Sequence, residues 1–170
     1  MDNDDEKICW IIFLTFKFTV MKKFIFIPII FCMFFVSHSV SAQTINCDSK
    51  PFVPPGFSVA EHQKGGQLEF DPQKVSLFLS ENQKNGKSIT ASDLQKEIVG
   101  KTVLNADVLD FLLAHPKLIP EEWAGKCVLF MGTIYNDKGH LCVRFLIGET
   151  WGCVWLEGDL YSRFPVAIVI

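Results

Sequence analysis

The stretch that decides the fold is residues 127–147, CVLFMGTIYNDKGHLCVRFLI. Apolar side chains recur at every second position on both sides of residues 136–139, NDKG, which are typical turn residues. With a turn centred on Asp137-Lys138, the all-apolar faces of the two flanking strands coincide, and a slip of one residue would expose one of them. The stretch therefore predicts an antiparallel hairpin with one face on the core.

C-terminal to this hairpin, apolar residues continue to alternate with a period of two. Residues 151–156 predict a third strand, and residues 166–170 are a candidate fourth strand. Together with the hairpin they predict an antiparallel meander.

Helix signals come before the hairpin. Thr90 is positioned to cap a helix that carries Leu94 and Ile98 on one face and ends at Gly100. Asn105 is positioned to cap a second helix with a broad apolar stripe. The stripe consists of Val108, Leu109, Phe111, Leu112 and Leu113, and Pro116 ends the helix. A short turn from Pro120 through Trp123 follows.

Residues 71–80 fit two structures. Asp71-Pro72 resembles a helix start, whereas the alternation of Val75, Leu77 and Leu79 is typical of a strand, which we favour. The expected fold class is α+β, with two or three short helices followed by an antiparallel β-meander of three to four strands.

The N-terminus predicts export. Residues 21–42 have the layout of a signal peptide: two lysines after Met21, an uncharged apolar run, then small residues up to a cleavage point after Ala42. Residues 1–20 begin with an acidic run, the opposite of a signal peptide's start. We interpret them as a mis-assigned start or an N-terminal extension. The alternative is an uncleaved membrane anchor over residues 8–36, which is disfavoured because it would bury three lysines in the membrane.

The remaining chain divides into two expected parts. Residues 43–66 are rich in proline, glycine and polar residues, and predict a linker or an extended arm. Residues 67–170 predict a single α+β domain. The formal net charge is −3 and no basic run occurs, which argues against a nucleic-acid partner. A secreted or periplasmic protein that meets the membrane only transiently during export is expected.

Four cysteines remain after the predicted leader: Cys47, Cys127, Cys142 and Cys153. In an exported protein they are disulfide candidates, although burial as small apolar residues explains them equally well. The hairpin register holds Cys127 and Cys142 too far apart to bridge. Cys47, on the flexible approach to the domain, is the most adaptable partner. The absence of a Cys-x-x-Cys motif argues against a thioredoxin-like or zinc site, and we expect no metal or cofactor.

Two groups of residues on or near the meander are site candidates. His140, Cys142 and Arg144 share one strand face, where a cysteine beside a histidine could act as a nucleophile with its base. A solvent-facing strand with mixed side chains is the simpler explanation. The second group is aromatic and suits a sugar or peptide ligand, although core packing explains it more simply. Its members are Trp151, Trp155, Tyr135 and Tyr161.

Several segments resemble a family of small bacterial proteins of unknown function. They are FDP at 70–72, LFLS at 77–80, LNADVLDFLL at 104–113, LIPEEW at 118–123 and GTIY at 132–135. The likeness covers about residues 65–170 and departs after Gly148, where this chain has a shorter, less aromatic tail. It implies a bacterial origin and a self-contained domain, and it implies no activity.

Two main functional hypotheses follow. The first is an exported binding or interaction module for an unknown protein, peptide or glycan. The alternatives are an exported hydrolase-like enzyme centred on Cys142 and His140, and a small secreted effector.

Overall fold

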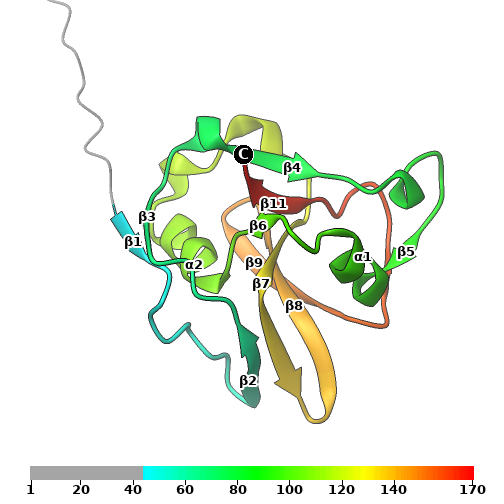
Figure 1. Ribbon diagram of the computed structural model, residues 1–170, viewed down its shortest axis with the longest axis horizontal. Coiled ribbons are helices and arrows are strands. Elements are labelled where there is room, and N and C mark those ends of the chain that lie inside the picture. The colour runs from blue at the N-terminus through cyan, green and yellow to red at the C-terminus, as the bar shows by residue number, and fades with distance from the viewer. Residues whose placement is uncertain (1–43) are drawn as a thin grey trace, which may run out of the picture. The chain divides into compact units, whose positions relative to one another are not determined.

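A computed structural model describes residues 44–170 (Figure 1), so the predicted leader and residues 1–20 lie outside the described residues. The strands are β1 (Thr44–Asn46), β2 (Phe57–His62), β3 (Gln67–Glu69), β4 (Val75–Phe78), β5 (Ile89–Thr90), β6 (Thr102–Val103), β7 (Val128–Asp137), β8 (His140–Ile147), β9 (Thr150–Trp155), β10 (Asp159–Leu160) and β11 (Val166–Val169). The α-helices are α1 (Ala91–Glu97) and α2 (Ala106–Ala114), and the 3-10 helices are η1 (Pro72–Lys74), η2 (Glu81–Gln83), η3 (Pro116–Leu118) and η4 (Glu121–Trp123).

A mixed seven-stranded sheet dominates the structure. Its main order is β4-β11-β7-β8-β9, while β2 also pairs with β7 and β6 with β11. The β11–β7 contact is parallel and the other pairs are antiparallel. The expected fold, a few helices followed by a three- to four-stranded antiparallel meander, is therefore wrong. The predicted meander is only the β7–β8–β9 part of a larger sheet that also recruits strands from before the helices.

Strands were expected in the segments of β4 and β11, but their place in the sheet was missed, and β6 was missed altogether. β4 and β11 have four residues each and β6 has two, so none of them carries a pattern long enough to indicate its partner. Their pairing partners lie far away in sequence, so no hairpin turn announces them. β11 also lies beside the parallel strand β7, a contact that the expected meander did not contain.

Strand β7 is buried on both faces, not on one. Val128 and Phe130 of β7, together with Leu146 of β8, pack with α2 in one cluster, called the α2 cluster below, whereas Leu129 and Met131 pack with α1 in another. Figure 1 shows α1 and α2 on opposite sides of the β7–β8 hairpin. The register of β7 with β8 shifts between Leu129 and Ile134. The continuous apolar run of β7 is therefore that of a strand covered on both sides.

The predicted helix caps are confirmed. The Thr90 side chain accepts a hydrogen bond from the Asp93 N–H at the start of α1, and the Asn105 side chain accepts one from the Asp107 N–H at the start of α2. Residues 71–80 contain both predicted structures, because Asp71 caps η1 and β4 follows directly.

The segment expected as a linker or extended arm packs into the domain as an extended arm. Its strand β2 pairs with the C-terminal half of β7, and β1 pairs with β3. Ile45 and Cys47 are buried in the same cluster as α2. The core therefore begins near residue 45, well before Leu68, where the sequence suggested that the domain starts.

Candidate functional site

β9 and β4 are the two outermost strands in the main order of the sheet, and the outer edge of β9 carries backbone groups that can bind another chain. Among residues 44–170, β9 pairs with β8 alone, with Cys142 opposite Trp155 and Arg144 opposite Cys153. The Leu156 N–H donates to the Leu141 carbonyl over 2.9 Å, which fixes the alternation of bonded and non-bonded pairs along the two strands.

That alternation determines which backbone groups point away from β8. Gly152 and Val154 bond to β8, whereas Trp151, Cys153 and Trp155 direct their N–H and C=O groups outward. Within residues 44–170, the only backbone bond recorded for these outward groups is that of the Trp155 carbonyl, which accepts from the Gly158 N–H over 3.0 Å. A row of free donors and acceptors at strand spacing therefore lies along β9.

The sequence of β9, TWGCVW, contains none of the devices that usually protect a sheet edge. Edge strands are generally blunted by lysine or another charge, by proline or by a bulge, and β9 has no charged residue, no proline and no register shift against β8. Its residues are half-buried or exposed, in contrast to the fully buried centre of β7. This edge is chemically suited to accept another extended chain.

Aromatic side chains flank the edge. Trp155 is 43% exposed, and its ring centroid lies 5.7 Å from that of His140 on β8. Trp151 is half-buried and packs against the α2 cluster. The Arg144 guanidinium lies over its ring, with 4.5 Å between Arg144 Cζ and the ring centroid. Two of the aromatic residues predicted from sequence therefore lie on the same strand and face, at its two ends.

The other two predicted aromatic residues do not join them. Tyr135 is fully buried on β7, and its hydroxyl donates to the Phe52 carbonyl over 3.0 Å, which fastens the N-terminal arm. Tyr161 is half-exposed in the loop after β10, where its carbonyl accepts from Gln83. Tyr135 therefore holds the arm in place and is not available to a ligand. Tyr161 is exposed but lies outside β9.

Arg144 is buried and its charge is paired inside the domain. It is 1% exposed, and its Nη2 donates to Asp110 Oδ1 of α2 over 2.8 Å. Its guanidinium also lies over the rings of Phe52 and Trp151. The side chain thus ties the arm and α2 to the sheet, and its charge is already paired within the domain.

The structure does not join Cys142 and His140 into a nucleophile and base. Cys142 is fully buried and burial raises the pKa of its thiol to about 12, so almost no thiolate exists at neutral pH. The Sγ atom of Cys142 contacts Cys153 Sγ at 3.3 Å, while the exposed His140 lies against Trp155. This arrangement provides no activated nucleophile.

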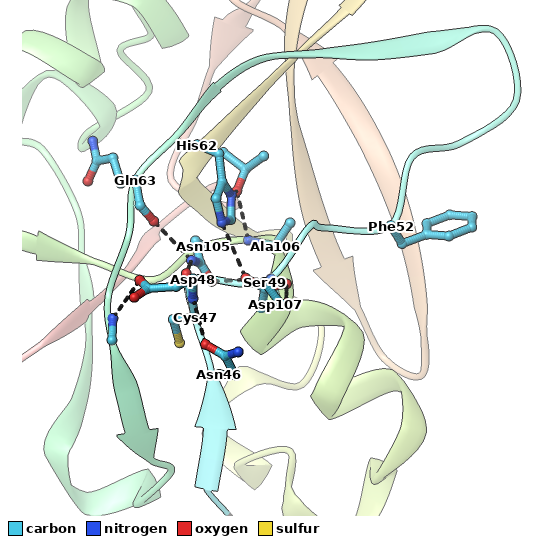
Figure 2. A network of polar contacts seen from close by, with 12 residues as sticks. Asn46, Cys47, Asp48, Ser49, Phe52, His62, Gln63, Asn105, Ala106 and Asp107 are labelled. Atoms are coloured by element: carbon cyan, nitrogen blue, oxygen red, sulfur yellow. Dashed lines mark hydrogen bonds and ion pairs between the residues drawn. The ribbon is translucent and has the colours of Figure 1, made fainter.

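A polar network missed by the sequence reasoning links the arm to α2 and β7 (Figure 2). His62 Nδ1 lies 2.9 Å from Thr133 Oγ1, and its Nε2 lies 3.3 Å from Asp107 Oδ2. The Ser49 hydroxyl donates to Asp107 Oδ1 over 2.7 Å, and Asn105 Nδ2 donates to two carbonyls of the arm. The two carbonyls are those of Cys47 and Gln63, at 2.8 and 3.0 Å.

This network resembles a catalytic triad only in its residue types. Thr133, which occupies the nucleophile's position, is 1% exposed, and its Oγ1 accepts from the Ala106 N–H over 3.0 Å. Burial raises the pKa of Asp107, partly offset by the Ser49 hydrogen bond and His62. The network therefore positions the arm. No local sequence signal announced it, because Ser49 and Asp107 are 58 residues apart.

A groove of about 1010 Å³ lies between the β3–η1 segment and the C-terminal end of α2 with η3. Phe70, Phe111 and Leu118 contribute apolar walls, and Lys74 and Lys117 lie among its charged lining residues. Because the lining carries both acidic and basic residues, the groove does not identify a ligand class.

Within the described part of the chain, no group of three or more His, Cys, Asp or Glu side chains is arranged to hold a metal ion. Residues 44–170 also contain no helix of the length and hydropathy that a membrane span requires. Comparisons of the chain with protein-family models, with curated proteins and with solved structures found no match.

Proposed function

We propose that the protein is an interaction module that binds an extended segment of a partner polypeptide along the outer edge of β9. The observation that carries the proposal is the row of backbone groups that have no partner among residues 44–170, on a strand without charge, proline or bulge. They are the N–H and C=O groups of Trp151 and Cys153 and the N–H of Trp155. An added strand satisfies these groups with main-chain hydrogen bonds. The ligand is therefore a polypeptide in extended conformation, not a glycan.

The flanking rings supply side-chain selectivity. Trp151 and Trp155 stand on one face of β9, two residues to either side of Cys153, so the partner's side chains on that face meet aromatic surface at both ends. Alternate side chains of the partner point to the opposite face. The favoured partner sequence alternates apolar residues at a spacing of two.

The proposal includes export. The leader predicted at residues 21–42 supports a secreted or periplasmic location, and the resemblance to small bacterial proteins of unknown function stays a prediction beside it. Cleavage after Ala42 is tested by the intact mass of the protein recovered from outside the cytoplasm.

The binding test pans a random peptide library displayed on phage against the full chain. The discriminating variant is Trp155→Lys, which places an edge-blocking charge beside the free backbone groups. Its matched control is Tyr161→Lys, which replaces another half-exposed aromatic residue, at 50% exposure, away from β9. We expect selected peptides to bind the wild type and the control alike and to bind Trp155→Lys about tenfold more weakly.

Amide chemical-shift changes locate the bound peptide. We expect the largest changes at Trp151, Cys153 and Trp155. Changes confined to residues 111–120 would assign the peptide to the groove and contradict the proposal. Equal binding by both lysine variants would also contradict it, and so would sedimentation showing that the free chain already self-associates through β9.

A further inference from the structure

Cys142 and Cys153 lie on neighbouring strands and point to the same face of the sheet. They are diagonal neighbours, since Cys142 is opposite Trp155 and Cys153 is opposite Arg144. Diagonal residues on paired strands are usually about 7–8 Å apart. The two sulfur atoms are nevertheless only 3.3 Å apart, so both side chains are turned toward each other.

The surroundings of the two thiols exclude most other roles. Cys142 is fully buried beside Tyr135 and Ala106, and the half-buried Cys153 packs against the same cluster. Neither cysteine belongs to a group of three or more potential metal ligands among residues 44–170. The close contact is thus not explained by a metal site or by an activated nucleophile.

The other two described cysteines have different neighbours. Cys47 is buried in the α2 cluster, and its N–H donates to the Gly66 carbonyl. Cys127 precedes β7, and its N–H donates to the Arg163 carbonyl. In the described residues, the only sulfur–sulfur contact recorded is that between Cys142 and Cys153.

We infer that Cys142 and Cys153 are the redox-active pair of this protein and form a cross-strand disulfide in an oxidising compartment. A disulfide has a sulfur–sulfur distance of about 2.0 Å, so closure brings the two sulfur atoms roughly 1 Å closer together. Because the Cα atoms of a disulfide are usually no more than about 7 Å apart, closure also draws the backbones of β8 and β9 slightly together at this point. This inference goes beyond the proposed binding function and does not depend on it.

The oxidant is a small or protein disulfide that reacts by thiol–disulfide exchange. The Cys153 thiolate attacks one sulfur atom of the external disulfide, forms a mixed disulfide and releases one thiolate. The Cys142 thiolate then attacks Cys153 Sγ, and the second external thiolate leaves. The two protein thiols lose two protons and two electrons, and the external disulfide is reduced to two thiols. Cys153 is the entry point because it is the more exposed of the two.

Burial sets the rate of this reaction. It raises the pKa of Cys142 to about 12 and also raises that of Cys153. Because the thiolate is the reacting form, both exchange steps accelerate as the pH rises through the alkaline range. The pair is expected to oxidise slowly in glutathione disulfide alone near neutral pH, and faster with a catalyst of disulfide exchange.

The disulfide leaves the docking edge available. Both sulfur atoms lie on a face of the sheet, whereas the free backbone groups of Cys153 point along the plane of the sheet away from β8. The bond ties β9 to β8 and holds the edge in place.

The test is peptide mapping of the folded full chain after exposure to glutathione disulfide at alkaline pH, with acid quenching and alkylation of the remaining thiols. Trypsin cuts after Lys138, Arg144 and Arg163, which separates Cys142 from Cys153. We expect peptides 139–144 and 145–163 to appear as one linked species that dithiothreitol separates. Linkage to any other cysteine, or glutathione retained on Cys153 beside an alkylated Cys142, would overturn the inference.

Two matched variants separate the effect of the pairing from an effect of misfolding. Cys47→Ser/Cys127→Ser retains the proposed pair and should give the same linked peptides at the same rate. Cys142→Ser should accumulate glutathione on Cys153, with no internal bond. If the double variant loses the linked species while its circular dichroism remains that of the wild type, the pairing is wrong.

Discussion

The two strands that flank the β7–β8 hairpin, β2 and β9, differ in how their edges are treated. β2 pairs with β7, carries Glu61 and His62, and shifts register between Val59 and Glu61. β9 pairs with β8 and has neither charge nor shift. A bulge and a charge are the usual protection of a sheet edge, so one side of the hairpin is protected and the other is open.

The two sides also differ in how they are held. His62 lies at the end of β2 against Thr133 and Asp107, and this buried network joins the arm, β7 and α2. Within residues 44–170, no polar side chain of β9 makes a comparable contact, and its side-chain hydrogen bond is that of Cys153 Sγ with Cys142 Sγ. We therefore expect substitutions on the β2 side to change stability, and exposed substitutions on the β9 side to change binding alone.

The largest expected effect is at Gly132 in β7, next to the arm. A Cβ there would lie 2.9 Å from Asn105 Cβ and 3.0 Å from the Asn105 Cα and the Leu104 carbonyl oxygen, so backbone would have to move. Gly132→Ala should lower the free energy of unfolding by about 3 kcal/mol. Chemical denaturation followed by tryptophan fluorescence measures it.

Gly152 in β9 is the matched control. A Cβ there would lie 2.4 Å from Cζ of Phe145, so the clash is with a half-buried side chain that can move by a change of its χ1 angle, whereas at Gly132 the clash includes backbone atoms. Gly152→Ala should therefore cost less than Gly132→Ala. An equal or larger loss for Gly152→Ala would show that the open side is packed as tightly as the anchored side.

The next effect is at Asn105. Asn105→Ala removes the hydrogen bonds to the carbonyls of Cys47 and Gln63 together with the cap of α2, and should cost about 2 kcal/mol. Hydrogen exchange of the arm's amides, residues 47–63, should accelerate. Thr90→Ala removes a helix cap only and should cost about 1 kcal/mol without changing the arm. Identical behaviour of the two variants would remove the anchoring role of Asn105.

A smaller effect concerns pH. Burial raises the pKa of Asp107 above its ordinary value of 3.8, an effect reduced by Ser49 and His62 and increased by Asp110 and Asp48. The stability contributed by the protonated carboxyl is thus present below pH 3.8 and is lost as the pH rises through the raised value.

The isosteric variant Asp107→Asn lacks this titration. Relative to the wild type, it should gain stability between mildly acidic and neutral pH. Denaturant midpoints of both proteins across this range measure the difference. A constant gap between the two proteins would show that Asp107 is not destabilised by its burial.

The parts of this structure that sequence could predict are local. The caps at Thr90 and Asn105 and the β7–β8 turn are read from residues that lie within a few positions of each other. The turn lies where the sequence predicts it, but the predicted register is wrong. Asp137 pairs with His140, one residue later than expected, and the pairing shifts again between Leu129 and Ile134.

The rest depends on contacts between distant segments. β11 joins β7 in parallel at the end of the chain, and Ser49 reaches Asp107 across 58 residues, so neither leaves a periodic signal. The candidate site divides in the same way. Trp151 and Trp155 were recognised as aromatic residues on one face, but the free edge beside them is a property of the strand order.

The central claim is that the outer edge of β9 is open, and amide hydrogen exchange of the free protein tests it most directly. We predict rapid exchange at Trp151, Cys153 and Trp155 and slow exchange at Gly152 and Val154, whose N–H groups bond to β8. A bound peptide should then slow the first three selectively. Uniformly slow exchange along β9 in the free protein would mean that the edge is already covered, and would contradict the account.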